Sequence, residues 1–370
     1  MEYKKMPLSE NVEEMFIGPF GSSLKNECFV AREHAYCMVY EQKHAIQKTM
    51  NVETRYIDEK KYKELQRFNI KGGDIIVSCR GTIGETFVVP EDAPLGIMHP
   101  SIMKIRLKDG VYDRYYFNSL LKMRLKKHEA EANGSGIKMA ISATELGKEL
   151  FPVPSLAEQE RIKELLSGVE TLICKRKEEL QLLDNLIKAR FVELFGDPVK
   201  NTMGWPSKPL NDVCDGIGDG LHGTPEYDDN GNYPFINGNN LIDGKIVITS
   251  ATKMVSEETY AKHRINISQN AILISINGTL GKVAFYNGEQ VMLGKSACYC
   301  NLKENINKVF VYGVMKSDAF AEFLDNSSTK STIKNVGLKA MREYKLILPP
   351  SKLQEQFATF VKQIDKSKVM

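Results

Sequence analysis

The sequence predicts a mixed α/β (α+β) protein in which two similar globular domains are joined by a long coiled-coil helix and followed by a shorter C-terminal helix. Three observations support this prediction. One segment returns in altered form at an offset of 197 residues, from Gly81 to Gly278. A stretch of about 40 residues has a helical apolar period, and strand-like and helix-like segments do not alternate in the regular rhythm of a Rossmann sheet.

The repeat is clearest where an apolar segment runs into a glycine-rich turn. Residues 74–84 read DIIVSCRGTIG and residues 271–281 read AILISINGTLG. Each copy continues to a proline, Pro154 or Pro349, ahead of a helix start in which Gln159 matches Gln354. A repeat of this length is a domain, because solenoid repeats have periods of roughly 20 to 50 residues.

Residues 1–153 form the first predicted domain. Apolar and β-branched residues at 74–78 and 102–107 indicate strands, and the pattern at 112–127 indicates a helix. Residues 197–349 form the second domain, in which Gly, Asn and Asp crowd the first third and predict loops.

Residues 154–196 are predicted to be one amphipathic helix with a coiled-coil seam. Ser155 can cap its start together with Glu158, and Gly196 ends it. Its length corresponds to a rod of roughly 60 Å. Its apolar residues recur in steps of three and four, which predicts a helix or partner interface at Ile162, Leu165, Val169, Leu172, Leu180, Leu183 and Ile187.

Residues 350–370 are predicted to be the shorter C-terminal helix. Its apolar residues Phe357, Phe360 and Ile364 match Ile162, Leu165 and Val169. We expect this helix to pack antiparallel on the long helix, with an approximate two-fold axis between the domains. Because it is about half as long, part of the long apolar face needs another partner.

Composition excludes several classes of protein. Hydrophobic content of 42% and charged content of 26% predict a folded chain rather than a disordered one. The sequence shows no membrane span and no secretory signal, so we expect a cytoplasmic protein. Seven irregularly spaced cysteines predict reduced thiols. The net charge of +3 is small, but residues 244–349 carry fourteen basic against eight acidic residues, so a basic face toward phosphates and a merely patchy surface both stay open.

No catalytic site and no metal site are predicted. Gly294-Lys295-Ser296 ends like a phosphate-binding loop, but five residues rather than four separate its glycines. The six histidines are scattered, without the spacing of a metal site. Adjacent carboxylates such as Asp228 and Asp229 are more often solvated than paired for acid–base chemistry.

The repeated turn Ser-x-x-Gly-Thr-x-Gly is the strongest candidate for a binding element. Its glycines permit close approach of a partner, although the fold alone could require them. The residue before the first glycine differs between the copies, Arg80 in one and Asn277 in the other. Arg pairs with guanine and Asn with adenine, so this exchange could change a base preference without changing the frame.

These residues, taken in order, resemble the specificity subunits of type I restriction-modification systems. The resemblance covers the whole chain and combines motifs that are weak singly but specific in their order and spacing. They are FIGPFGSSLK at 16–25, the two repeated turns, LAEQ at 156–159, FGDP at 195–198, the segment from Trp205 to Val213, and HGTP at 222–225.

The resemblance implies that each domain is a target recognition domain for one half of a bipartite double-stranded DNA sequence. The helices would fix the gap and dock two modification subunits, which would methylate adenine with S-adenosylmethionine; a restriction subunit would add ATP-driven cleavage. This chain would bind no cofactor and would not be an enzyme. By position, the DNA-facing candidates are Ser22, Ser23, Lys25, Arg80, Thr82, His222, Thr224, Asn277 and Thr279, with Lys138 and Lys334 toward phosphates.

Two other functions stay open from the residues alone. A stand-alone DNA methyltransferase or nuclease would act without partners, and a two-domain scaffold would bind protein segments and show no salt-dependent DNA affinity. The short C-terminal helix also raises the alternative that the long helix is covered by a modification subunit or by a second copy of the chain.

Overall fold

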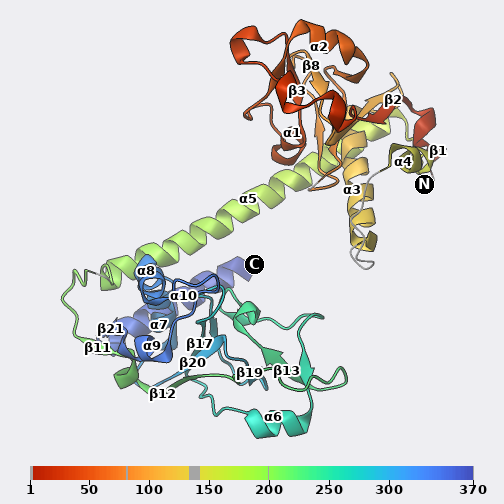
Figure 1. Ribbon diagram of the computed structural model, residues 1–370. Coiled ribbons are helices and arrows are strands. Elements are labelled where there is room, and N and C mark those ends of the chain that lie inside the picture. Colours follow the sequence, from red (N-terminus) through yellow and green to blue (C-terminus); the bar gives the residue numbers. More distant parts are fainter. Residues whose placement is uncertain (1–2, 81, 133–141, 199, 370) are drawn as a thin grey trace. The chain divides into compact units, whose positions relative to one another are not determined.

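The computed structural model describes residues 3–80, 82–132, 142–198 and 200–369 (Figure 1). The chain forms two compact units that divide at Cys174 and Lys175, inside the long helix. The domain limits at 153, 196 and 349 stay a prediction. Both units contain helices and sheets, which confirms the predicted mixed fold class.

The first unit contains two four-stranded sheets. One is antiparallel, with the strand order β2 (Val12–Ile17), β9 (Ile102–Leu107), β6 (Ile75–Ser78) and β7 (Thr86–Val88). The other has the order β4 (Tyr56–Ile57), β3 (Cys37–Tyr40), β8 (Gly96–Met98) and β5 (Asn69–Ile70), and its pair β3 and β8 is parallel. The short strands β1 (Lys5–Pro7) and β10 (Leu150–Pro152) pair separately. The helices are α1 (Gln42–Gln47), α2 (Glu59–Glu64), α3 (Arg114–Ala132) and α4 (Ala143–Lys148).

The second unit repeats the strand order of the antiparallel sheet and the parallel pair of the second sheet, which here has three strands. Its antiparallel sheet has the order β12 (Cys214–Asp219), β20 (Ala297–Leu302), β17 (Ala271–Ser275) and β18 (Val283–Phe285). The second sheet has the order β16 (Met254–Val255), β13 (Tyr233–Ile236) and β19 (Met292–Leu293), again with a parallel pair, β13 and β19. Two further pairs are β11 (Ser207–Pro209) with β21 (Lys345–Ile347) and β14 (Leu241–Ile242) with β15 (Lys245–Ile246). The helices are α6 (Glu257–His263), α7 (Lys308–Met315), α8 (Asp318–Ser327), α9 (Leu338–Glu343) and α10 (Ser351–Val369).

The repeated apolar segments are strands buried on both faces. In β6, Ile75 and Val77 pack into the core beside α3, whereas Ile76 packs into a second core toward the other sheet. In β17, Ile274 and Leu273 divide between two cores in the same way. Burial on both faces explains why these segments are continuously apolar instead of alternating.

The predicted long helix is confirmed as α5 (Leu156–Phe195), a single helix of 40 residues. Within the second unit, its C-terminal part packs antiparallel against α10. Phe191 contacts Phe357 with ring centroids 5.4 Å apart, and at the other end Arg176 donates a hydrogen bond to the Lys368 carbonyl at 2.8 Å. The expected antiparallel helix pair is therefore present over this part of α5.

The matched glutamines join each unit's helix to its core. Gln159 is fully buried; its side chain donates to the carbonyls of Val111 (2.8 Å) and Pro154 (2.9 Å) and accepts from the Asp113 amide (2.8 Å). Gln354 makes the corresponding contacts, donating to the Pro349 carbonyl at 2.8 Å and accepting from the Asn307 amide at 3.0 Å. Since Asp113 and Asn307 cap α3 and α7, the glutamines fix the angle between two helices in both units.

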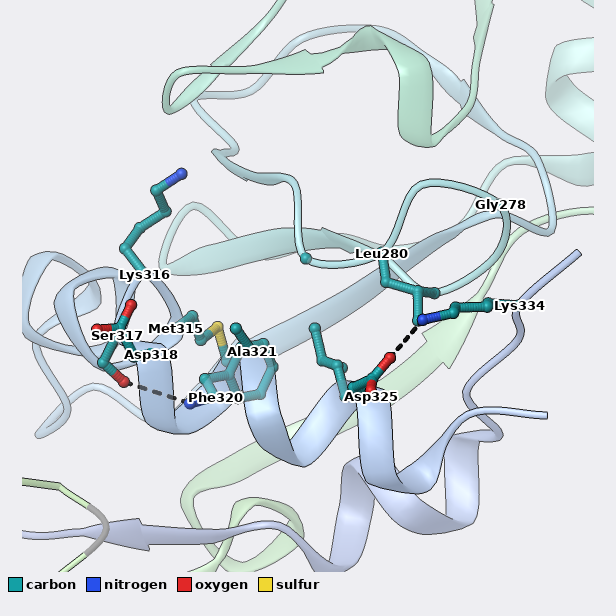
Figure 2. A pocket seen from close by; sticks show the side chains of 12 residues that line it. Gly278, Leu280, Met315, Lys316, Ser317, Asp318, Phe320, Ala321, Asp325 and Lys334 are labelled. Carbon is teal, nitrogen blue, oxygen red and sulfur yellow. Dashed lines mark hydrogen bonds and ion pairs between the residues drawn. The ribbon is translucent and has the colours of Figure 1, made fainter. Parts of the chain in front are cut away.

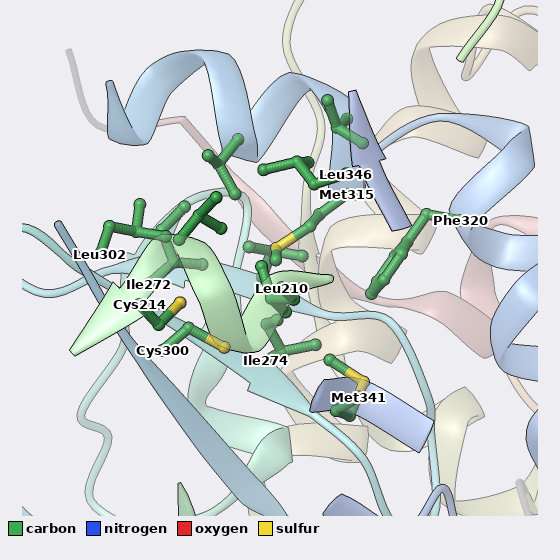
Figure 3. Close-up of a cluster of buried hydrophobic side chains, with 14 of the residues drawn as sticks. Leu210, Cys214, Ile272, Ile274, Cys300, Leu302, Met315, Phe320, Met341 and Leu346 are labelled. Atoms are coloured by element: carbon green, nitrogen blue, oxygen red, sulfur yellow. The ribbon is translucent and has the colours of Figure 1, made fainter. Parts of the chain in front are cut away.

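Buried cysteines contribute to the core of the second unit (Figure 3). Cys214, Cys298 and Cys300 are free thiols, and the last two have no exposed surface. Hydrogen bonds with Cys214 and Cys298, together with burial, raise the pKa of Cys300 well above its ordinary value. This thiol is therefore protonated and behaves as a small apolar side chain.

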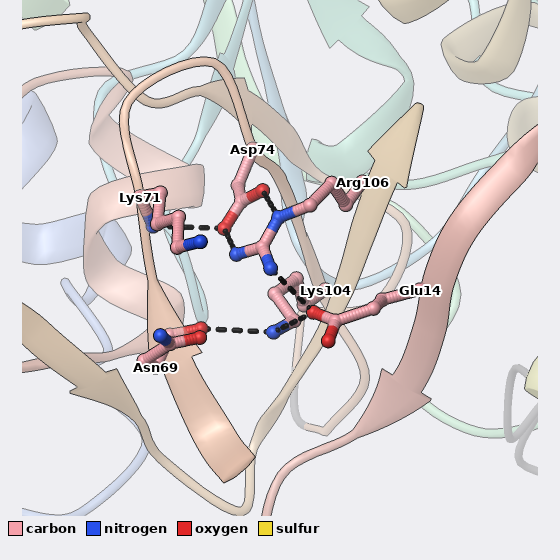
Figure 4. Close-up of polar contacts among 6 residues, drawn as sticks. All are labelled: Glu14, Asn69, Lys71, Asp74, Lys104 and Arg106. Atoms are coloured by element: carbon pink, nitrogen blue, oxygen red, sulfur yellow. Dashed lines mark hydrogen bonds and ion pairs between the residues drawn. The ribbon is translucent and has the colours of Figure 1, made fainter. Parts of the chain in front are cut away.

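A buried ionic network lies on the other face of the antiparallel sheet in the first unit, since Cys298 and Cys300 match Met103 and Ile105 rather than Lys104 and Arg106 (Figure 4). The Lys104 side chain has no exposed surface and donates to Glu14 Oε2 at 2.6 Å and to the Asn69 carbonyl at 2.9 Å. Arg106 makes a two-point contact with Asp74, with both bonds 2.7 Å long, and also donates to Glu14. The strand registers place Tyr299, Asn301, Ala271 and Gly216 at the matching positions of the second unit, so the same fold is built there from neutral residues.

We expect the first unit to lose stability in acid through Glu14. Burial raises the pKa of Glu14, but the hydrogen bond from Lys104 and the nearby positive charges outweigh it, so the pKa lies below its ordinary value of 4.5. The stabilisation is present above the unfolded-state pKa and is lost as the pH falls through the folded-state pKa. Unfolding of the first unit between pH 6 and about 3 should therefore depend less on pH in Glu14→Gln than in the wild type.

Glu13→Gln is the matched control, since it removes the same charge from an exposed neighbour that makes no hydrogen bond to Lys104 among the described residues. Hydrogen exchange of the β9 amides measures the effect in the first unit. Equal pH dependence in the wild type and in Glu14→Gln would contradict the expectation.

None of the helices in the described part of the chain combines the length and the hydropathy that a bilayer crossing requires.

Candidate nucleic-acid interface

Two predicted binding segments of the first unit emerge side by side at one end of its antiparallel sheet. β9 lies between β2 and β6 in the sheet. The C-terminal ends of β2 and β6 are both next to the first residues of β9. The amide of Gly18, after β2, donates to the Ile102 carbonyl at 3.0 Å, and the amide of Cys79, after β6, donates to the Ser101 carbonyl at 2.8 Å. We call this region the first loop edge: the loop 18–25, the turn after β6, and residues 99–101.

The candidates at the first loop edge are accessible. Ser22, Lys25, Arg80 and Thr82 are exposed, and Ser23 is half-buried. Lys138, predicted to meet phosphate, lies outside the described residues.

The second unit builds the same arrangement. Leu221, at the start of its loop, exchanges backbone hydrogen bonds with Leu293 and Lys295, at 2.8 and 3.0 Å, and the Ile276 amide donates to the Ser296 carbonyl at 3.0 Å. We call the loop 220–225, the turn after β17 and residues 294–296 the second loop edge. His222, Thr224 and Thr279 are exposed there, and Asn277 is half-buried. His222 Nε2 lies 2.8 Å from Asp219 Oδ2.

The repeated serine holds the turn together, a role that its place in the sequence motif does not indicate. Ser275 is fully buried; its hydroxyl donates to the Thr279 carbonyl at 2.6 Å and accepts from the Lys282 amide at 2.8 Å. Ser78 accepts from the Glu85 amide at 3.0 Å in the first unit. The last glycines of the turns, Gly84 and Gly281, have φ values of +85° and +75°, which favour glycine. The frame of the turn is thus the same in both units, and the residues Arg80 and Asn277 are presented by it.

The loop edges differ in charge. In the first, Glu41 is buried and forms ion pairs with Lys43, at 3.0 Å, and with Arg55, whose guanidinium lies 4.1 Å from the centre of the Phe29 ring. In the second, the matching residue after the parallel strand is Asn237, which accepts a hydrogen bond from the Ser296 hydroxyl at 3.0 Å. An ion-paired carboxylate therefore lies beside the first loop edge, at the position where the second has the neutral amide of Asn237; the second loop edge itself carries the exposed Lys295.

His99 is a further residue at the first loop edge and is not among the candidates predicted from the sequence. Its Nδ1 lies 2.8 Å from the Ser101 hydroxyl, and burial lowers its pKa, so the ring is neutral near pH 7. Ser101 and Ser296 match at an offset of 195, just before the repeated strands β9 and β20. Extending the repeat by these few residues would have pointed to this position.

Lys334 lies beside the turn of the second unit, next to a cavity of about 360 Å³ (Figure 2). Its carbonyl accepts from the Gly278 amide at 2.9 Å, and its ammonium group forms an ion pair with Asp325. The cavity lies where the helix that is continuous in the first unit, α3, is divided into α7 and α8 by the capping residue Ser317. Lys334, the predicted phosphate contact, therefore lies at the second loop edge, but its ammonium group is already paired with Asp325.

The predicted helix-interface residues fall into two groups. Leu180, Leu183, Ile187, Phe360 and Ile364 are half-buried and Phe357 is buried, all in the second unit. Ile162 packs against the core of the first unit. By contrast, Leu165, Val169 and Leu172 are 60%, 52% and 67% exposed, so the first part of α5 keeps an apolar face uncovered.

The described residues contain no group of three or more His, Cys, Asp or Glu side chains placed to hold a metal ion. The accessible polar groups at both edges are instead hydrogen-bond donors and acceptors of the kind that contact phosphates and base edges.

The family model for the type I restriction modification DNA specificity domain matches this chain twice, over residues 13–182 and 203–369. The chain belongs to this family. It is a type I specificity subunit with two specificity domains, and each match contains one loop edge. The predicted family is therefore confirmed.

Similar proteins agree with this membership. The EcoBI specificity subunit of Escherichia coli is 21% identical over 79% of this chain and 66% of its own length. The MjaIX specificity subunit of Methanocaldococcus jannaschii is also 21% identical, over 84% of this chain and 75% of its own length.

Two solved structures share the fold over the whole chain. The type I restriction-modification S subunit from M. genitalium superposes with a TM-score of 0.52 at 15% identity, covering 90% of that subunit. A chain from a structural study of assembly and conformational transition in a type I R-M system gives a TM-score of 0.56 at 16% identity, covering 91% of that chain.

Proposed function

We propose that this specificity subunit binds double-stranded DNA through its two loop edges, each contacting one half of a bipartite target. The observation that carries the proposal is the shared frame with different side chains: both units fix the same turn through a buried serine, yet present Arg80 in one and Asn277 in the other. A constant frame with exchanged donors and acceptors is suited to two different base readouts.

The chain itself is proposed to supply specificity and no catalysis. Modification subunits, two per complex, would methylate adenine with S-adenosylmethionine, and a restriction subunit would add ATP-driven cleavage; this chain would bind neither cofactor. The uncovered apolar face of α5 around Leu165, Val169 and Leu172 supports a docking role, either for a modification subunit or for a second copy of the chain.

Genome-wide mapping of methylated adenine, in cells that express the chain with its modification subunit, tests the proposal. We expect a split motif with a spacer of fixed length, and exchange of residues 1–153 for those of another family member should change one half of the motif. A short undivided motif would contradict the two-domain readout. Methyl transfer by the purified chain alone would instead support a stand-alone methyltransferase.

Lys334 provides a second test, of phosphate binding. Asp325→Asn should free Lys334 to contact a phosphate, so the DNA affinity of the complex should rise at low salt and fall more steeply with salt concentration, with a log–log slope steeper by about one. Lys334→Ala in the Asp325→Asn background should abolish both changes. Glu322→Gln, an exposed acid on the same helix, is the control for the change in net charge. If the salt dependence of DNA affinity is the same for the Asp325→Asn and Glu322→Gln complexes, Lys334 does not contact DNA.

A further inference from the structure

Asn277 and Asn335 lie opposite each other where the turn of the second loop edge meets a later segment of the chain. They form an antiparallel bridge. The flanking backbone hydrogen bonds run from Val336 to the Ile276 carbonyl and from Gly278 to the Lys334 carbonyl, both 2.9 Å long. The asparagines are therefore a pair of the non-hydrogen-bonded type, in which side chains of one face come closest together.

The two side chains are joined directly. Asn277 Nδ2 donates to Asn335 Oδ1 at 3.2 Å, and both residues are half-buried. Thr329 binds the Asn335 backbone. The Thr329 hydroxyl accepts a hydrogen bond from the backbone N–H of Asn335 at 3.1 Å, and the backbone N–H of Thr329 donates to the backbone carbonyl of Asn335 at 3.0 Å. The Asn335 backbone is thus held in place, and its side-chain Oδ1 accepts one N–H of Asn277.

In the structure this contact turns one N–H of the Asn277 amide toward Asn335. Within the described part of the chain, its second N–H and its Oδ1 make no hydrogen bond. One N–H donor beside one carbonyl acceptor matches adenine, which presents N7 as an acceptor and the N6 amino group as a donor in the major groove. Guanine presents two acceptors, N7 and O6, so the Asn277 carbonyl would face an oxygen. Rotation of the amide by half a turn would exchange its donor and acceptor and spoil this match.

Arg80, at the matching position of the first unit, does not need such an orienting contact. A guanidinium carries donors only, so it presents the same chemistry to N7 and O6 of guanine from either side. An asparagine side chain carries a donor (NH2) and an acceptor (C=O), so the base that it selects depends on how the amide is oriented.

We propose that Asn335 is a positioning residue that orients the Asn277 amide to select adenine at one position of the target half bound by the second unit. This inference rests on the proposed DNA-binding function. It adds a residue from a segment far along the chain, and it names the base whose major-groove edge fits.

The test uses the full chain in complex with its modification subunit, with adenine methylation mapped genome-wide for the wild type and for four variants. Asn335→Ala removes the acceptor, and methylation of sites with another base at one position of one half should rise about tenfold relative to the wild type, within the range that one two-point base contact provides. Asn335→Asp keeps an acceptor at the same place and should retain the wild-type selectivity. Asn277→Ala should lose selectivity at the same position as Asn335→Ala. Thr332→Ala, in the same exposed segment, should leave the motif unchanged.

Two results would overturn the inference. One is an unchanged motif in Asn335→Ala; the other is equal loss of methylation at all sites in Asn335→Ala and Asn335→Asp, which would assign Asn335 a structural role alone. Trp205, the single tryptophan, lies in the same unit, and its fluorescence reports whether each variant is folded. A wild-type motif that is not split would contradict the proposed function, whereas the comparison of Asn335→Ala with Asn335→Asp still decides the role of Asn335.

Discussion

Replacement of Phe357 by alanine is expected to lower the free energy of unfolding of the second unit by about 3–5 kcal/mol. Phe357 is 1% exposed and makes edge-to-face contacts with Phe191 and Phe195, whose ring centroids are 5.4 and 5.6 Å from its own. Gly313 on α7 lets the rings approach, since a Cβ there would lie 2.8 Å from the Phe191 ring. The truncation leaves a cavity that rigid aromatic neighbours fill poorly.

Trp205 is a suitable probe of this change, because its indole donates to the Phe195 carbonyl at 3.1 Å. Denaturant unfolding monitored by its fluorescence should show an earlier midpoint for Phe357→Ala. Phe20→Ala is the matched control: it removes the same atoms from a side chain that is 87% exposed in the first unit, and should change stability by less than about 0.5 kcal/mol. If both variants unfold at the same denaturant concentration, α10 is not docked as described.

Replacement of Arg106 by alanine is expected to destabilise the first unit by about 3–5 kcal/mol, because it removes the partner of a buried charge. The Asp74 side chain is only 2% exposed, and Arg106 supplies two of its hydrogen bonds. Without the guanidinium, Asp74 keeps the Lys71 amide as a donor but has no counterion in contact. Hydrogen exchange of the β6 and β9 amides should accelerate accordingly.

The second unit supplies the control for this prediction. Its matching residues are Ala271 and Asn301, so the double variant Asp74→Ala, Arg106→Asn gives the first unit the neutral pair that the same fold already uses. We expect it to be more stable than Arg106→Ala, since no buried charge is left unpaired. A double variant less stable than Arg106→Ala would mean that Asp74 stabilises the unit without Arg106. The Trp205 transition, in the other unit, should not move in either variant.

The helices and the repeat were predictable because their causes are local. The apolar residues of α5 recur at the helical period for 40 residues without an interrupting proline, so the helix follows from periodicity. The sequence shows that Gln159 matches Gln354, but it does not show why a glutamine is needed there. The backbone groups that these side chains hydrogen-bond lie on other segments, at Val111 and at Asn307. A hydrogen-bond partner distant in sequence leaves no periodic pattern.

The candidate site shows the same limit. The sequence pointed to Arg80, Asn277 and the two loops at 18–25 and 220–225. It could not place the loops beside the turns, because that neighbourhood arises from the sheet order in which β9 and β20 each lie between the two strands that carry these segments. His99 reaches its edge in the segment that leads into β9, and Asn335 reaches the other edge through its bridge to Asn277; neither carries a motif of its own.

By itself, the sequence determined that this protein has two related units, a long amphipathic helix and a repeated turn in which the residue before the first glycine is exchanged. These features depend on residues near one another in the chain, where spacing alone sets which side chains share a face. The tertiary structure decided which parts of α5 are covered, which unit has a charged interior, and which residues stand beside Arg80 and Asn277. Such outcomes depend on long-range strand pairing and burial, where one fold accepts either the ion pairs of Lys104 and Arg106 or the neutral side chains of Tyr299 and Asn301.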